Sequence, residues 1–108
     1  MDAIVTKDAE KMLCTLYKAY LERRKSGAPK QSARRFEAAY FPTTEPFASM
    51  DYRDVDDAKL ELSRKGLLRV ILGGDCDITD DALVYLDNRF KDGLVSVISF
   101  LAQFIQKW

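Results

Sequence analysis

Gly73 and Gly74 stand side by side between two short segments that favour β-strands. The segment from Leu67 to Leu72 is rich in leucine, valine and isoleucine, and Asp75 to Ile78 is long enough for a short returning strand. Adjacent glycines can both adopt the positive φ that a two-residue hairpin turn requires. A four-residue loop between the two strands fits this sequence nearly as well as a two-residue turn. This stretch therefore predicts a β-hairpin.

The hairpin is expected to lie between two capped helices. One helix is predicted to begin near Asp51 or Tyr52, with Asp51 as its N-cap, and to end at Gly66. Thr79 is expected to cap the next helix, whose first turn carries acids that the helix dipole favours. The residues expected to face the core are Val55, Ala58, Leu62 and, as a further candidate, Leu60 in the earlier helix, and Ala82, Tyr85, Leu86 and Phe90 in the later one.

Three further helices are predicted outside this stretch. The first begins after a Thr6 cap and ends near Lys25, where a Ser-Gly-Ala-Pro sequence interrupts it. The second is predicted from about Lys30 to Tyr40, and the prolines that follow predict an irregular connection up to Met50. The last helix is predicted from Leu94 nearly to the end of the chain.

Two phrases in this part of the chain have a counterpart in a known family. They are Leu62-Ser63-Arg64-Lys65-Gly66-Leu67-Leu68 and Ile78-Thr79-Asp80-Asp81-Ala82-Leu83-Val84-Tyr85-Leu86. Together they resemble the winged helix-turn-helix superfamily, in particular small bacterial and phage proteins of the YjcQ-like kind. Ala82 stands where that family usually has glycine. The match covers about residues 51–90, and the first two helices fit by pattern only.

The resemblance implies a three-helix core with a β-wing, and in many members the third helix enters the major groove of DNA. We therefore expect a single domain over residues 1–108. Its fold class is α+β and mainly helical: a winged helix-turn-helix with one β-hairpin wing and an additional C-terminal helix.

The distribution of charge departs from that family expectation. The net charge is zero, whereas DNA-binding domains are usually basic. Carboxylates occupy the predicted third helix and the wing, at Asp51, Asp54, Asp56, Asp57, Asp75, Asp77, Asp80 and Asp81. The four acids from Asp75 to Asp81 do not follow the EF-hand pattern of calcium-binding loops. We therefore expect them to be solvated or to cap a helix, and we favour this interpretation over a cation site.

The basic residues gather elsewhere, at the end of the first helix and on the second. Any contact with double-stranded DNA should come from Arg23, Arg24, Lys25, Lys30, Arg34 and Arg35, helped by Lys59, Arg64 and Lys65. The alternative is a solvated face whose charges pair with the acidic half of the same molecule or its neighbour.

The predicted last helix is apolar over much of its circumference. Its stripe consists of Leu94, Val97, Ile98, Leu101, Phe104, Ile105 and Trp108. Such a helix is normally buried, so we expect it to form the interface of a homodimer. The alternative is that it packs against the first helix of the same chain.

Two functions follow from these patterns. The first is a DNA-binding protein of the transcriptional-regulator type. The second is a protein-interaction module that does not bind DNA and uses either the acidic third helix and wing or the apolar C-terminal helix.

The composition gives little support for catalysis or for bound cofactors. Without histidine, triads and zinc sites that need it are excluded, so we expect no enzyme, metal or cofactor. Cys14 lies among apolar residues and is expected to be a small core side chain. The N-terminal residues do not read as a signal peptide and no apolar run is long enough to span a bilayer, so we expect a cytoplasmic protein without a membrane partner.

Overall fold

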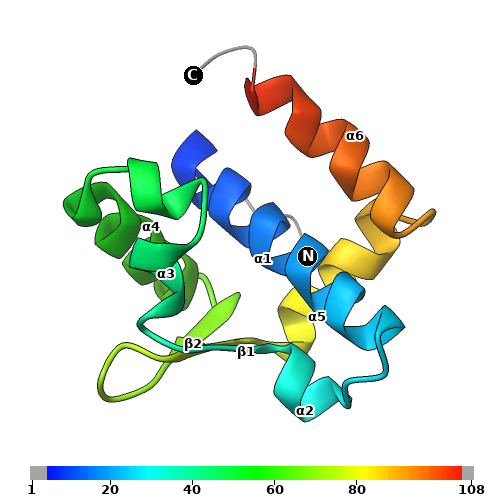
Figure 1. The fold of residues 1–108 in the computed structure, drawn as a ribbon, viewed down its shortest axis with the longest axis horizontal. Coiled ribbons are helices and arrows are strands. Elements are labelled where there is room, and N and C mark those ends of the chain that lie inside the picture. Colours follow the sequence, from blue (N-terminus) through cyan, green and yellow to red (C-terminus); the bar gives the residue numbers. More distant parts are fainter. Residues whose placement is uncertain (1–4, 106–108) are drawn as a thin grey trace.

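The computed structural model describes residues 5–105, with the side chain of Ile105 left out, and shows a mainly helical α+β fold (Figure 1). The elements in chain order are α1 (Lys7–Lys25), α2 (Lys30–Ala33), β1 (Arg35–Phe36), α3 (Tyr40–Thr43), the 3-10 helix η1 (Phe47–Ser49), α4 (Tyr52–Arg64), β2 (Leu68–Val70), β3 (Cys76–Ile78), α5 (Asp80–Arg89) and α6 (Leu94–Ile105).

The predicted hairpin is present, with a wider loop than a two-residue turn. Val70 pairs with Cys76, and the Ile71 amide donates to the Asp75 carbonyl at 2.7 Å. Gly73 and Gly74 both have positive φ, at 95° and 96°, as the sequence predicted. We call residues 71–75 the hairpin loop.

Residues 30–40 do not form the single helix that was predicted there. The helix stops at Ala33, and Arg35 and Phe36 form β1. This strand adds to the hairpin as a third antiparallel member, in the order β1-β3-β2. Burial of Phe36 and pairing with β3 outweigh the helical pattern of such a short segment. The connection up to Met50, predicted to be irregular, contains two short helical turns, α3 and η1.

The helix caps form as predicted. The Thr6 hydroxyl accepts from the Ala9 amide at 3.4 Å, and Asp51 Oδ1 accepts from the Arg53 amide at 2.9 Å. The Thr79 hydroxyl accepts from the Ala82 amide at 3.1 Å. These bonds satisfy backbone donors that a helix start leaves free. Their observed positions confirm the predicted starts of α1, α4 and α5.

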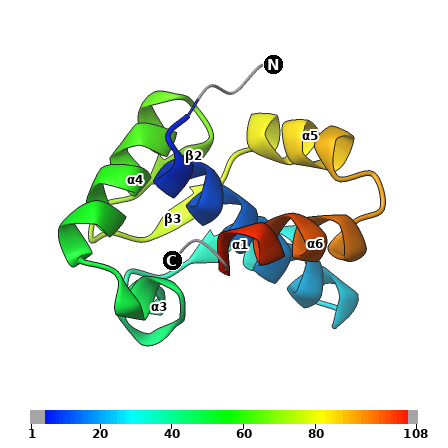
Figure 2. The same cartoon turned by 90° about the horizontal axis from the view of Figure 1, so that it is seen from above.

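One cluster of buried side chains lies between α1, the sheet and the other helices. α1 runs through the middle, with α4 on one side and α5 and α6 on the other (Figures 1 and 2). Cys14 is fully buried, which confirms its predicted place in the core. Leu60 is 52% exposed, so its predicted inward position is wrong; it lies opposite the buried face formed by Val55, Ala58 and Leu62.

Candidate functional site

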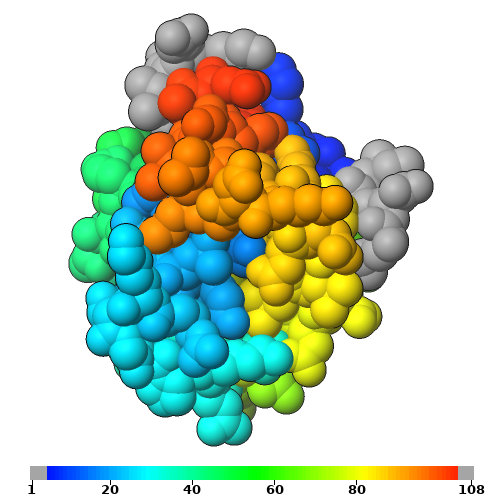
Figure 3. Space-filling view, turned by 90° about the vertical axis from the view of Figure 1, so that its right-hand side faces the viewer, coloured from blue at the N-terminus to red at the C-terminus, as the bar shows by residue number. Residues whose placement is uncertain are grey.

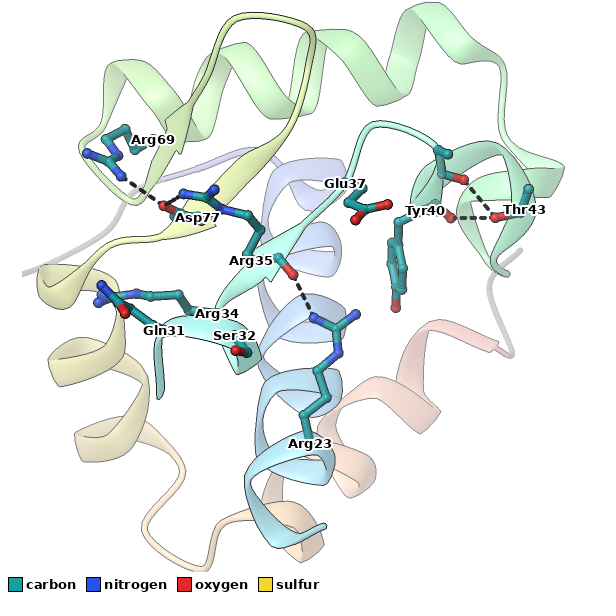
Figure 4. A pocket seen from close by; sticks show the side chains of 11 residues that line it. Arg23, Gln31, Ser32, Arg34, Arg35, Glu37, Tyr40, Thr43, Arg69 and Asp77 are labelled. Carbon is teal, nitrogen blue, oxygen red and sulfur yellow. Dashed lines mark hydrogen bonds and ion pairs between the residues drawn. The ribbon is translucent and has the colours of Figure 1, made fainter. Parts of the chain in front are cut away.

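An open groove of about 930 Å³ lies beside the sheet, with α2 and α3 at its sides (Figure 4). We call it the arginine groove. Its lining comprises Arg23, Gln31, Ser32, Arg34, Arg35, Glu37, Ala39, Tyr40, Thr43, Arg69 and Asp77. Four arginines face two carboxylates in this lining, so the groove keeps an excess of two positive charges.

The sheet brings two of these arginines to one carboxylate. Asp77 lies on the central strand, opposite Arg35 of β1 and Arg69 of β2. Arg35 binds it through Nε and one terminal nitrogen, at 2.7 and 2.9 Å, and Arg69 donates at 2.9 Å. The Asp77 side chain is 10% exposed, whereas the two arginines remain open to solvent. The Arg35 hydrogen bond lowers the pKa of Asp77 to about 2, with Arg69 contributing, so the carboxylate is ionised at neutral pH.

Arg34 is held at the C-terminal end of β3. Its Nε donates to the Ile78 carbonyl at 2.8 Å, and a terminal nitrogen donates to Asp80. Lys30 also pairs with Asp80, at 3.2 Å. The hydrogen bond from Arg34 lowers the pKa of Asp80, with Lys30 adding to the effect.

Arg23 reaches the groove from α1. Its terminal nitrogen donates to the Arg35 carbonyl at 2.7 Å and to the Ala33 carbonyl at 3.3 Å. Its guanidinium lies 4.3 Å from the centre of the Phe36 ring. These contacts fix the side chain without neutralising its charge, because its described hydrogen-bond partners are carbonyl oxygens.

The arrangement can bind anions. A guanidinium carries five N–H donors, and the contacts above use only some of those on each arginine. Arginines that are already oriented lose less freedom when they bind, and their planar geometry suits two-point contact with phosphate or carboxylate.

The structure brings together only part of the predicted DNA-binding set. Arg23, Arg34 and Arg35 line the groove, whereas Arg24, Lys25, Lys30, Lys59, Arg64 and Lys65 do not. Sequence reasoning missed Arg69. Its position in β2, opposite an aspartate of the returning strand, is a signal that becomes readable only once the hairpin register is known.

Three other residues that were predicted to contact DNA lie on α4 or at its end. Lys59 donates to the Gly74 carbonyl at 2.9 Å and lies 4.5 Å from the centre of the Phe41 ring. Arg64 and Lys65 are exposed. The pKa of Glu61 is lowered mainly by its hydrogen bonds with Thr6, and Lys65 and Arg64 add to this effect.

The acids from Asp75 to Asp81 were expected to be solvated or to cap a helix. The structure corrects this expectation, because three of them bind other groups of the protein. Asp77 and Asp80 pair with basic side chains, and Asp75 Oδ1 accepts from the Ala38 amide at 2.8 Å. Arg34 and Arg35 therefore pair with acids of the same molecule, as the alternative to a DNA-binding surface predicted. Among residues 5–105, no group of three histidine, cysteine, aspartate or glutamate side chains could hold a metal ion.

The apolar stripe of α6 packs largely within its own chain. In the space-filling view α6 (orange to red) lies over α1 (blue) (Figure 3). Val97 is fully buried, and Leu94 and Leu101 are partly buried against the core. Phe104 packs on Phe100, edge to face. Ile98 is 47% exposed. The side chain of Ile105 and all of Trp108 lie outside the described residues, so the structure does not place these two members of the predicted interface.

Among the helices of residues 5–105, none has the length and apolar character needed to cross a membrane. Comparisons of the sequence and structure with protein-family models, curated proteins and solved structures found no match.

Proposed function

We propose that this chain is a non-enzymatic winged-helix protein that binds the phosphate backbone of double-stranded DNA through the arginine groove. Two features support the winged-helix assignment. A β-hairpin follows α4 directly, and β1, which lies between α1 and α4 in the chain, completes the sheet in the order β1-β3-β2.

The observation that carries the binding proposal is the convergence of Arg23, Arg34, Arg35 and Arg69 in one open groove. They come from α1, the end of α2, β1 and β2, so the tertiary fold is needed to bring them together. Phosphate contacts supply the sequence-independent part of DNA affinity. The groove offers such contacts, with oriented guanidinium groups.

The proposed contact differs from the usual docking of a winged helix. Asp54, Asp56 and Asp57 are exposed on α4, the helix that would enter the major groove. Carboxylates on that helix repel phosphate, so we place the contact at the arginine groove and expect weak dependence on base sequence.

Fluorescence anisotropy with a labelled mixed-sequence duplex tests this function. Phosphate binding predicts that affinity falls steeply as salt rises from about 50 mM to about 200 mM. Arg69→Gln should weaken binding and lower the salt slope by about one unit, because it removes one phosphate contact while leaving the two Arg35–Asp77 bonds.

Lys91→Gln is the matched control, since it also removes one exposed positive charge but lies between α5 and α6, outside the groove. Absence of a complex at micromolar protein in low salt would overturn the proposal. Equal weakening by Arg69→Gln and Lys91→Gln would also overturn it, because the groove would then have no special part in binding.

We also keep the homodimer and the cytoplasmic location as proposals. The exposed apolar surface of α6, at Val95 and Ile98, supports the former. The free cysteines Cys14 and Cys76 are compatible with the latter.

A further inference from the structure

We infer that α4 and the hairpin loop form a docking surface for a cationic, amphipathic segment of another protein. This surface goes beyond the proposed DNA contact, since none of its residues lines the arginine groove.

α4 presents two large apolar side chains to solvent, and one of them, Leu60, lies opposite the buried face of the helix. Val55, Ala58 and Leu62 point into the core, whereas Tyr52 is 73% exposed and Leu60 is 52% exposed. Tyr52 and Leu60 are eight residues apart, so they lie slightly more than two turns from each other along the helix and about 80° apart around its axis. Tyrosine is a typical anchor of protein interfaces, and exposed apolar side chains along a helix serve partners that bind lengthwise.

Three exposed carboxylates lie on the same helix. Asp54, Asp56 and Asp57 are exposed and form no ion pair with any residue between 5 and 105, whereas Arg53 is paired with Asp51 at 2.8 Å. The exposed side of α4 therefore combines apolar anchors with three carboxylates that form no ion pair within the described residues.

The hairpin loop extends this surface beyond the helix. Lys59 of α4 donates to the Gly74 carbonyl at 2.9 Å, which holds the loop beside α4 (Figure 1). Leu72 in that loop is 100% exposed. A partner that lies along α4 can therefore reach a third apolar side chain on a second element.

Charge complementarity selects the occupant. An interface core gains affinity from apolar contact, while uncompensated carboxylates at its rim favour lysine and arginine and reject acidic partners. The occupant we commit to is thus a segment with an apolar stripe flanked by basic residues, such as an amphipathic helix.

The probes are two synthetic helical peptides with the same leucine stripe, one with lysine and one with glutamate on the polar face. Backbone amide shifts of the labelled full chain are followed during titration with each peptide. We expect the lysine peptide to shift the amides of Tyr52, Asp56, Leu60 and Leu72, and the glutamate peptide to leave them unchanged.

Two variants make the test specific. Asp56→Asn with Asp57→Asn should weaken binding of the lysine peptide by about tenfold, because both changes remove rim charge without adding bulk. The matched control, Asp81→Asn with Asp92→Asn, removes two exposed carboxylates outside this surface and should change the affinity less than twofold.

Shifts spread over the whole molecule, or equal weakening by the two double variants, would overturn the inference. The inference would also be overturned if α4 binds a second copy of this chain. In that case light scattering would give a dimer mass for the wild type and a monomer mass for Leu60→Lys. Failure of the DNA proposal is separate: Arg69→Gln should leave peptide binding unchanged.

Discussion

Arg35 and Asp77 lie directly opposite each other on neighbouring strands, and their side chains form two hydrogen bonds of 2.7 and 2.9 Å. The pair joins the short β1 to the hairpin, which otherwise would share only a few backbone bonds with it. It also sets the position of one guanidinium in the arginine groove. The same contact therefore supports the sheet and shapes the candidate site.

This contact predicts a stability that depends on acid pH. The pKa of Asp77 is about 2 in the folded protein, below its ordinary value of 3.8. A depressed pKa means that the ionised carboxylate stabilises the fold above about pH 4 and that this contribution is lost as pH falls toward about 2. Urea unfolding of the wild type and of Asp77→Asn checks this.

We expect Asp77→Asn to lower the free energy of unfolding by about 1–2 kcal/mol near neutral pH, because two arginines lose a charged partner. The difference between the two proteins should shrink as pH falls toward about 2. A difference that does not change with pH would contradict the pairing.

Thr79 is predicted to stabilise two elements at once. Its hydroxyl accepts from the Ala82 amide at 3.1 Å and donates to the Gly66 carbonyl at 2.7 Å, so it joins the start of α5 to the end of α4. Thr79→Ala should cost about 1–2 kcal/mol in the free energy of unfolding. Thr79→Ser, which keeps the hydroxyl, should cost clearly less, and equal losses in the two variants would argue against the bonds.

The packing of α6 predicts different responses at two neighbouring residues. Val97 is fully buried in the chain's own core and Ile98 is 47% exposed. Val97→Ala should therefore lower the free energy of unfolding by about 2 kcal/mol, and Ile98→Ala by less than about 1 kcal/mol. The reverse order would show that α6 packs by another face.

A substitution in α6 also tests the proposed homodimer. Light scattering of the wild type should give a dimer mass if Ile98 contributes to an interface between copies, and Ile98→Glu should give a monomer. A monomer mass for the wild type at tens of micromolar would defeat the dimer proposal.

Both cysteines are predicted to be unreactive in the folded protein. Burial raises the pKa of the Cys14 thiol to about 12 and that of Cys76 to about 11. Since the thiolate is the reactive form, a disulfide reagent at about pH 8 should label neither residue until urea unfolds the chain. Rapid labelling of the native protein would contradict the burial of both thiols.

Local sequence determined the helix starts and the position of the hairpin. Thr6, Asp51 and Thr79 cap their helices, and Gly73 and Gly74 adopt positive φ, because these features depend on residues only a few positions apart. The burial of Val55, Ala58 and Leu62 followed in the same way from helical spacing. Such features can be read without knowing how the chain folds back on itself.

The tertiary structure alone decided the rest. β1 interrupts the helix predicted over residues 30–40 because Phe36 is buried and its strand pairs with β3, 40 residues away in the register Phe36↔Cys76. The same pairing places Arg35 on Asp77, and the hairpin register adds Arg69 to that carboxylate. Long-range pairing depends on which segments meet in space, and neither residue spacing nor local propensity encodes that. The sequence alone thus determined where the long helices begin and where the hairpin turns, and the fold decided which charges face each other.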